Sequence, residues 1–292
     1  MSEQTDISTD WLAGVREEFK RQEIVRQWFR IGLESRDLSC LSDEDWGELL
    51  IPSPLPRKIW MYWAQGWDAA PEITQACRAS WFHHNPDWEI CLLDDSTYRD
   101  YVDIDDIVGG KEMGLAHQAD VLRLRLLGKF GGVWVDATTF CTRPLSHWLP
   151  VLMQSGFFAF SYPRPDRYLS NWFLASVAGG EMVRMWLELI KQYWSQVDRA
   201  DHYFWAHYLF GYGCQTNPKM GAGWRATPHL SAHGALQPQV LAFDEEAEAR
   251  AVASLKENLV PVVKLTYKTN GVPAAQAALG RFSDLLLGTL KD

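Results

Sequence analysis

The order of hydrophobic and polar positions predicts strands that alternate with helices from about residue 57 onward. Short apolar or aromatic stretches predict strands at Lys58–Trp63, Trp88–Leu93, Val133–Ala137, Phe157–Ser161, Trp172–Ser176 and Val260–Tyr267. Stretches whose apolar residues recur every three or four positions predict helices at 71–84, 115–130, 181–196, 201–210 and 273–290. This alternation is typical of an α/β sandwich with a mostly parallel central sheet.

The first fifty residues show a different pattern. Residues 11–50 are expected to be helical, with one apolar stripe at Leu12, Val15 and Phe19 and a second at Ile24, Trp28 and Ile31. Such a basic amphipathic helix either lies on an anionic membrane surface or packs on the main domain, and its acidic neighbours favour packing. The proline-rich stretch 51–56 ends any helix, so we divide the chain into an N-terminal helical extension, 1–50, and one main domain, 51–292.

Composition narrows the class of protein. Of the 292 residues, 47% are hydrophobic and 22% charged, which is enough apolar surface for one large core. A net charge of −9 argues against nucleic acid as a partner. No apolar run reaches the roughly 20 residues of a membrane-spanning helix, and the N-terminus lacks a secretory signal. The five cysteines never form Cys-x-x-Cys, which excludes a zinc ribbon. We therefore expect a cytoplasmic protein without a transmembrane segment, with peripheral contact at the inner face of the membrane left open.

A lone carboxylate ends the third predicted strand. Asp136 follows a tight turn at Gly131-Gly132 and the apolar residues 133–135. In open α/β sheets, ligands bind beyond the carboxyl ends of the strands. Asp136 is therefore placed either to meet ligand hydroxyls or a divalent cation, or to cap the next turn.

The helix before this strand has two charged residues on one face. Asp120 and Arg123 are three residues apart in a helix that is otherwise nearly apolar. Charges on a mostly buried helix are paired or serve a ligand. The two residues thus form either an internal ion pair or a binding group in which Asp120 meets a sugar hydroxyl and Arg123 orients it or neutralises phosphate.

These segments together resemble the capsular polysaccharide synthesis proteins, and they are similar to the Asp-x-Asp sugar transferases of glycosyltransferase family 32. The resemblance covers roughly residues 55–270. Its most specific block is Ala119–Leu124 followed by Lys129–Thr138. Supporting blocks occur in the same order along the chain, at Ile59–Gly66, Ser80-Trp81, Pro86–Trp88, Asn171–Phe173, Tyr203-Phe204 and Lys264–Lys268.

The resemblance implies a GT-A-like fold and a nucleotide-sugar-dependent transferase of the hexosyltransferase type. The donor would be a nucleotide sugar, and the acceptor a surface glycan of the capsular or lipopolysaccharide type or its lipid-linked precursor. Carried over by position, Asp120 and Asp136 would bind the donor's ribose and its metal–diphosphate region. The other donor-binding positions implied in this way are Trp60 or Trp63 against the base, Arg123 near the sugar or phosphates, Gln65 and Thr138.

Thr138 stands where the family 32 enzymes have their second Asp, so the resemblance leaves Asp136 as the single predicted ligand of a Mn²⁺ or Mg²⁺ ion. The alternative is that Lys264 and Lys268 neutralise the departing diphosphate. Their spacing of four places both on one face of the predicted late strand, or makes them two surface lysines on an edge strand. The predicted catalytic groups are Asp120, Asp136 and these two lysines.

Two questions stay open at the level of sequence. A catalytically silent nucleotide-sugar or polysaccharide-binding protein would present the same binding residues. If the reaction inverts configuration, a base near the acceptor is required, and Asp94, Asp95 and Asp201 are equally placed in the sequence. The glycine pairs at 211–213 and 221–223 lack the context of a dinucleotide fingerprint and are expected in loops.

Overall fold

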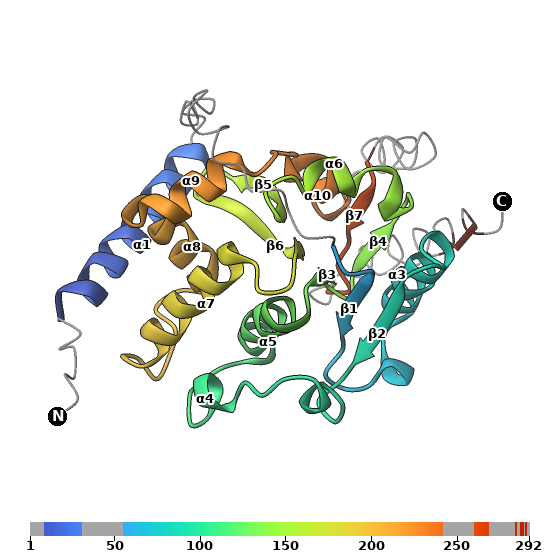
Figure 1. The fold of residues 1–292 in the computed structure, drawn as a ribbon, viewed down its shortest axis with the longest axis horizontal. Coiled ribbons are helices and arrows are strands. Elements are labelled where there is room, and N and C mark those ends of the chain that lie inside the picture. Colours follow the sequence, from blue (N-terminus) through green and yellow to red (C-terminus); the bar gives the residue numbers. More distant parts are fainter. Residues whose placement is uncertain are drawn as a thin grey trace.

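The computed structural model describes residues 9–30, 55–241 and 260–268, together with 284, 287–288 and 290. A five-stranded sheet lies at its centre, in the order β2-β1-β3-β6-β5 (Figure 1). Its strands are β1 (Lys58–Tyr62), β2 (Glu89–Leu93), β3 (Gly132–Val135), β5 (Phe157–Arg164) and β6 (Arg167–Ser176). A smaller antiparallel sheet pairs β4 (Thr139–Cys141) with β7 (Val262–Lys264).

Helices cover both faces of the central sheet. Figure 1 shows α1 and α7–α9 on one side and α3, α6 and α10 on the other. The described α-helices are α1 (Thr9–Arg30), α3 (Glu72–His84), α4 (Asp105–Val108), α5 (Leu115–Phe130), α6 (Leu149–Leu152), α7 (Glu181–Trp194), α8 (Trp205–Thr216), α9 (Pro218–Ala226) and α10 (Ala232–Leu241). No helix among these described residues is both long enough and apolar enough to pass through a bilayer.

The sheet is mixed, which corrects the expectation of a mostly parallel one. β1 runs parallel to β2 and β3, as predicted. β6 is antiparallel to both β3 and β5. The reason is local: only residues 165–166 separate β5 from β6, and a turn this short reverses the chain and makes a hairpin. The predicted strands at 157–161 and 172–176 were too short. In the structure both strands extend toward each other, to Arg164 and Arg167, and so form a hairpin.

Alternation along the strands divides the core between the two faces. Ile59 and Met61 belong to the cluster beneath α3 and α6, whereas Trp60 and Tyr62 belong to the larger cluster with α5, α7 and α8. Successive side chains of a strand point to opposite faces, so both faces of β1 are buried. This explains why the strand is aromatic and apolar throughout rather than amphipathic.

The N-terminal helix packs on the main domain, as the favoured alternative predicted. Val15 and Phe19 are buried, and the Phe19 ring lies 5.4 Å from that of Tyr208 in α8. Arg16 pairs with Asp201 at 3.1 Å. The side chains of the second predicted stripe lie outside the described residues, as does nearly all of the predicted helix 273–290. The division of the chain at residue 50 stays a prediction.

The two glycine pairs lie in helices rather than in loops. The first falls in α8, which begins at Trp205 rather than at 201, and the second falls in α9. A Cβ added to Gly221 would lie 2.5 Å from the carbonyl oxygen of Cys214 in α8. Glycine is therefore needed here because two helix backbones approach closely, and the pattern that suggested flexibility reflects tight packing.

The turn between α5 and β3 has the predicted geometry. Gly131 and Gly132 have φ angles of 67° and 95°, which residues with a Cβ rarely adopt. An added Cβ at Gly132 would also meet the Lys58 carbonyl oxygen at 2.5 Å. The chain thus passes from helix into the central strand without a linker, and this sets the distance between Asp120 on the helix and Asp136 beyond the strand.

Candidate functional site

A cavity of about 550 Å³ opens at the carboxyl ends of β1 and β3. From β1 the chain crosses to β2 on one side, and it later returns to β3 on the other side, so the two neighbouring strands mark a switch in strand order. Open α/β sheets bind ligands at such points. Residues 62–65 after β1 and 136–138 after β3 line the cavity, together with residues 264–268 at and after the end of β7.

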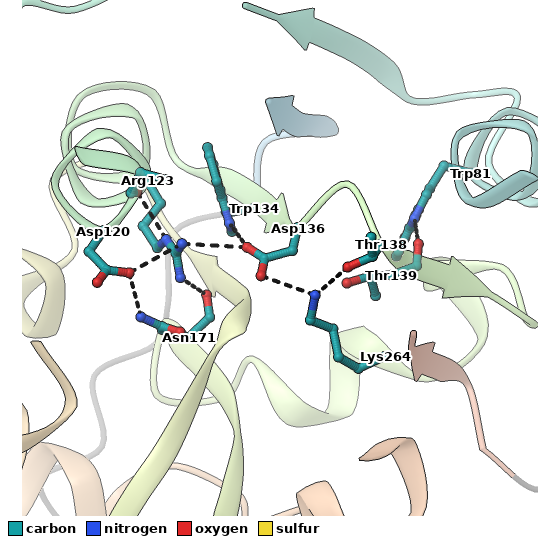
Figure 2. Close-up of polar contacts among 10 residues, drawn as sticks. Trp81, Asp120, Arg123, Trp134, Asp136, Thr138, Thr139, Asn171 and Lys264 are labelled. Carbon is teal, nitrogen blue, oxygen red and sulfur yellow. Dashed lines mark hydrogen bonds and ion pairs between the residues drawn. The ribbon is translucent and has the colours of Figure 1, made fainter. Parts of the chain in front are cut away.

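Arg123 joins the two predicted carboxylates. Its Nη2 lies 3.2 Å from Asp120 Oδ1 and 3.4 Å from Asp136 Oδ1 (Figure 2). Asn171 Nδ2 donates to Asp120 Oδ1 at 2.7 Å, and Trp134 Nε1 donates to Asp136 Oδ1 at 3.0 Å. The Arg123 side chain is only 6% exposed, so its charge is balanced inside the protein.

The remaining Arg123 nitrogens also donate to the protein. Nε donates to the Ala119 carbonyl oxygen at 3.0 Å, and Nη1 donates to the Asn171 carbonyl oxygen at 2.6 Å. A guanidinium whose three nitrogens all have protein partners holds its neighbours in place. The geometry therefore supports the ion-pair alternative and makes Arg123 a positioning residue for Asp120 and Asp136. Its contact with donor sugar or phosphates, implied by the resemblance, stays a prediction.

The pairing of β4 with β7 in the small sheet brings Lys264 to the Asp136 carboxylate. Lys264 pairs with Thr139 across β4 and β7, which places its Nζ 3.3 Å from Asp136 Oδ2. The same Nζ donates to Thr138 Oγ1. Figure 2 shows the resulting chain of contacts from Asn171 to Thr138, which we call the strand-end network: Asp120, Arg123, Asp136, Thr138, Asn171 and Lys264.

The two carboxylates have opposite pKa shifts. Burial raises the pKa of Asp120 to about 6, against the attraction of Arg123. Burial would also raise the pKa of Asp136, but Lys264, Arg123 and the Trp134 donor together hold it below its usual value. Asp136 is thus the stably ionised member of the pair near neutral pH, and Asp120 is poised to gain a proton in mild acid.

A bulge in β6 brings Asn171 to the network. Between the pairs Ala159–Leu174 and Ser161–Leu169, β6 advances five residues while β5 advances two. The extra residues include Asn171 and Trp172, which line the cavity. Bulges are common beside active sites, where they redirect side chains. No local pattern in the sequence marks this one.

The two predicted tryptophans separate. Trp60 is fully buried, and its Nε1 donates to the Gly131 carbonyl oxygen at 2.9 Å, so it is a core residue that does not line the cavity. This corrects its placement against the donor base. Trp63 lines the cavity with Gln65, and its ring lies 5.2 Å from that of Tyr267. Trp60 was misplaced because a shift of one residue along a strand moves a side chain to the opposite face of the sheet, and the sequence alone does not show which face meets the cavity.

Lys268 lies at the cavity but not on a shared strand face with Lys264. β7 ends at Lys264, and Lys268 is an exposed residue in the segment that follows. Both nevertheless line the cavity. The four-residue spacing predicted the right neighbourhood and the wrong local structure.

The three acids proposed as a base do not line the cavity. Asp94 accepts hydrogen bonds from Ser96 and Thr97 and caps a turn. Asp95 accepts from Tyr62, and Asp201 from Tyr193. All three thus have structural partners, and none of the three is among the residues that line the cavity.

Four further residues of the cavity wall were not predicted from the sequence. Arg164 and Arg167, from the end of the β5–β6 hairpin, line it together with His117 and His207. Burial, with the positive charges of Arg167 and Arg123, lowers the pKa of His207 well below its usual value, so this imidazole is neutral. The only sequence signal was the Arg-x-x-Arg spacing at 164–167 around Pro-Asp, which is typical of a tight turn.

The cavity is basic in an acidic protein. Five basic side chains line it, Arg123, Arg164, Arg167, Lys264 and Lys268, against two carboxylates, Asp120 and Asp136. The whole chain has a net charge of −9. A concave site whose charge opposes that of the molecule concentrates anions.

The donor set does not suit a resident divalent cation. Asp136 already faces Arg123 and Lys264, and Asp120 is held by Arg123 and Asn171. Within the described part of the chain, no three His, Cys, Asp or Glu side chains converge as a metal site. Hard cations take several oxygen ligands, whereas this carboxylate is already paired with two basic groups.

Comparisons with known proteins bear on the same segments. The family model for the capsular polysaccharide synthesis protein matches residues 48–278. The "O-glycosyltransferase braB" of Annulohypoxylon truncatum is 26% identical over 171 residues, 51% of this chain and 40% of that protein. The "O-glycosyltransferase PaGT" of Phomopsis amygdali is 24% identical over 170 residues, 51% of this chain and 42% of that protein. The chain thus spans about two fifths of the length of these relatives.

Among solved structures, the one titled "PaToxG Glycosyltransferase" matches with a TM-score of 0.44 at 12% identity, covering 96% of this chain and 98% of that one.

Proposed function

The chain belongs to the capsular polysaccharide synthesis protein family, and from this premise we propose that it is a glycosyltransferase using a nucleotide-sugar donor. The acceptor in this proposal is a surface glycan or its lipid-linked precursor. One observation supports it most: a basic cavity at the carboxyl ends of β1 and β3, in a chain of net charge −9. A nucleotide sugar brings a diphosphate, which such a cavity attracts. The parallel strands β1–β3 with the site at their switch point support a GT-A-like organisation.

In this proposal the diphosphate lies at the Lys264 side of the strand-end network. Lys264 is 13% exposed and held by Asp136 and Thr138, so its charge is fixed in place before a ligand arrives. Preorganised charge at the position where negative charge develops lowers a reaction barrier. Lys268, four residues on, extends the positive wall toward solvent. Trp63 and Tyr267 offer ring faces for the base.

Asp120 is assigned to the sugar. Both of its hydrogen-bond and ion-pair contacts, from Asn171 and Arg123, fall on Oδ1. We assign the other oxygen, Oδ2, to a sugar hydroxyl. In the reaction, the bond between the anomeric carbon and the diphosphate oxygen breaks, and its electron pair leaves with the diphosphate. The acceptor hydroxyl oxygen forms the new bond to the anomeric carbon, and its proton passes to the departing diphosphate or to solvent.

Because Asp136 is already paired with two basic groups, we assign charge neutralisation to Lys264 and Lys268 rather than to a cation. Measuring transfer after exhaustive treatment with EDTA tests this assignment. Activity that survives EDTA supports it. Activity lost completely in EDTA and restored by Mn²⁺ contradicts it.

Thermal-shift titration with UDP-, GDP- and CDP-sugars tests the donor class. A ligand at 100 times its dissociation constant stabilises the native state by about 2.7 kcal/mol, so a true donor raises the melting temperature by an amount that grows with the logarithm of its concentration. The variant Asp136→Asn keeps the shape of the site and removes the charge that fixes Lys264. We expect it to fold and to lose about 10²-fold or more of the transfer rate.

Hydrolysis of the bound donor separates an enzyme from a silent binding protein. The enzyme releases free sugar slowly in the absence of acceptor, and Asp136→Asn abolishes that release. Donor binding without any hydrolysis or transfer favours the silent alternative. Full turnover by Asp136→Asn removes Asp136 from the site.

A further inference from the structure

The end of the β5–β6 hairpin forms a wall of the cavity that the proposed donor site does not use. We call residues 163–167 the hairpin tip. Pro163, Arg164 and Arg167 line the cavity, and the turn itself is Pro165-Asp166. Asn171, which holds Asp120, lies four residues along β6 from Arg167, within the bulge between Leu169 and Leu174. The hairpin tip and the strand-end network therefore use different stretches of β6.

Two like charges face one another at the hairpin tip. Arg164 and Arg167 are directly opposite in the β5–β6 register. Like charges in this position destabilise a hairpin. The fully buried Asp166 carboxylate lies 3.3 Å from Arg167 Nε and accepts a hydrogen bond from Tyr208 at 3.1 Å, so it counters the charge of Arg167. Within the described residues, the Arg164 side chain has neither a hydrogen bond nor an ion pair, so its charge is uncompensated.

The backbone before Arg164 is strained. Tyr162 has a φ of 48°. Among the described residues, it is the one residue other than glycine with a positive φ. It lies in a bulge, because β5 advances three residues between Ser161 and Arg164 while β6 advances two. Residues held in such conformations cost stability and concentrate at ligand sites. The bulge changes the direction of β5 just before the two residues that line the cavity, Pro163 and Arg164.

Arg167 is oriented by an aromatic ring. Its guanidinium carbon lies 3.8 Å from the centre of the Phe204 ring, and Tyr203 beside it is 59% exposed at the cavity. Stacking on an aromatic face holds a guanidinium flat. An uncompensated arginine beside a second, rigidly held arginine is suited to a carboxylate or a phosphate.

We propose that the hairpin tip is a second anion subsite, which binds a carboxylate or phosphate carried by the transferred sugar or by the acceptor. This inference rests on the proposed function, because that function places the donor diphosphate at Lys264 instead. The like-charged pair and the strained bulge both cost stability in the free protein, and a bound anion offsets the first of these costs. The substrate class is therefore an acidic sugar or a phosphorylated acceptor.

The test compares three variants of the full chain. Arg164→Gln removes the uncompensated charge, and Arg164→Lys keeps the charge but loses the planar fork. Arg78→Gln in α3 is the matched control, because this substitution removes the same charge at a residue that does not line the cavity. Dissociation constants are measured by calorimetry for UDP and GDP, with Lys264→Gln as the variant at the donor site.

The same proteins are then titrated with acid and neutral probes of matched shape. UDP-glucuronic acid against UDP-glucose, and GDP-mannuronic acid against GDP-mannose, probe an anion on the transferred sugar. Methyl glucuronide against methyl glucoside, and glucose 6-phosphate against glucose, probe an anion on the acceptor. We expect the wild-type protein to favour the acid member of at least one pair by roughly tenfold, the strength of a hydrogen bond to a charged group. Arg164→Gln should abolish this preference, Arg164→Lys should reduce it, and Arg78→Gln should keep it.

The outcomes separate the two proposals. An acid preference lost in Arg164→Gln, with nucleoside diphosphate binding weakened by Lys264→Gln alone, supports both. Acid preference without binding of any nucleoside diphosphate supports the anion subsite but contradicts the assignment of the donor site. Nucleoside diphosphate binding that Arg164→Gln weakens as much as Lys264→Gln does, without acid preference, overturns the subsite and assigns the hairpin tip to the diphosphate. The subsite is also overturned if Arg78→Gln loses the preference equally.

Discussion

The two charged walls of the cavity differ in how their charges are balanced. In the strand-end network, Arg123 bridges two carboxylates and Lys264 holds a third contact to the same pair. At the hairpin tip, two arginines oppose each other and Asp166 counters Arg167 alone. The charges of the first wall are balanced by partners within the protein, whereas the second wall has an unbalanced positive charge.

Residues whose charges are balanced inside the protein position their neighbours, whereas an unbalanced residue is free to bind a ligand. A complete network fixes the orientation of its carboxylates, so its loss is felt first as lost stability. An incomplete wall adds little to stability, so its loss is felt as lost binding. Each prediction below tests whether a residue belongs to the wall to which the structure assigns it.

The largest effect is expected from Arg123→Gln. This change leaves Asp120 with no cation and Asp136 with Lys264 alone, and breaking a buried ion pair costs about 3–5 kcal/mol. The free energy of unfolding, measured by urea denaturation, should fall by that amount. Arg125→Gln, two residues along the same helix, breaks a partly exposed pair with Asp106 and should cost less than about 1 kcal/mol. Equal losses in the two variants would show that Arg123 is not a bridging residue.

The next effect separates the two carboxylates by pH. The pKa of Asp120 is about 6 in the folded protein and 3.8 in the reference state, so this group favours folding below pH 4 and loses that contribution as the pH rises through 6. The loss amounts to about 3 kcal/mol at 1.36 kcal/mol for each pKa unit. The stability of Asp120→Asn relative to the wild type should therefore be about 3 kcal/mol higher at pH 7 than near pH 4.

The control for this pH profile is Asp106→Asn, which removes an exposed carboxylate of α4 that pairs with Arg125 of α5. Its stability relative to the wild type should be nearly constant between pH 4 and 7. If the relative stability of Asp120→Asn instead falls or stays constant from pH 4 to pH 7, Asp120 is held ionised like Asp136.

A third and smaller effect is expected at Lys264. Its pairing with Asp136 is partly exposed, so we expect Lys264→Gln to lower the free energy of unfolding by about 1–2 kcal/mol at pH 7. Lys264 helps to hold the pKa of Asp136 down, and that contribution is lost as Asp136 gains its proton in acid. The cost of the variant should therefore shrink as the pH falls. Lys268→Gln, at an exposed residue beyond the strand, should change stability by less than about 0.5 kcal/mol. Equal costs at the two lysines would remove Lys264 from the strand-end network.

The sequence predicted the strand-end network better than the hairpin tip, and the reason is physical. Asp136 follows a buried strand and a glycine turn, and Asp120 lies one helix before it, so local periodicity is enough to place both. The role of Arg123 depends on Asn171, 48 residues away, through a bulge that no local pattern marks. Trp60 and Trp63 show a related limit of prediction from sequence. The aromatic residues predicted a strand here correctly, but they did not decide which of the two tryptophans faces the cavity.

Helix α9 shows a second limit. The glycines of 221–223 have a low propensity for helices, so a single sequence assigns them to a loop. Contacts with α8 and α7 outweigh that preference, since only a residue without a Cβ fits against the Cys214 carbonyl. Tertiary packing decided the structure here, and it is invisible to local pattern.

The smallest expected effect is a gain in stability from removing Arg164. Because Arg164 opposes Arg167 directly and pairs with no described residue, Arg164→Gln relieves repulsion without breaking a contact. We expect the free energy of unfolding to rise by about 0.2–1 kcal/mol at low salt. The gain should fade toward 1 M salt, where the Debye length is about 3 Å and the two charges are screened. Arg78→Gln, which has no opposing arginine in its helix, should show no comparable salt-dependent gain. If Arg164→Gln is instead destabilising at every salt concentration, Arg164 has a partner inside the protein, and the contrast between the two walls fails at that residue.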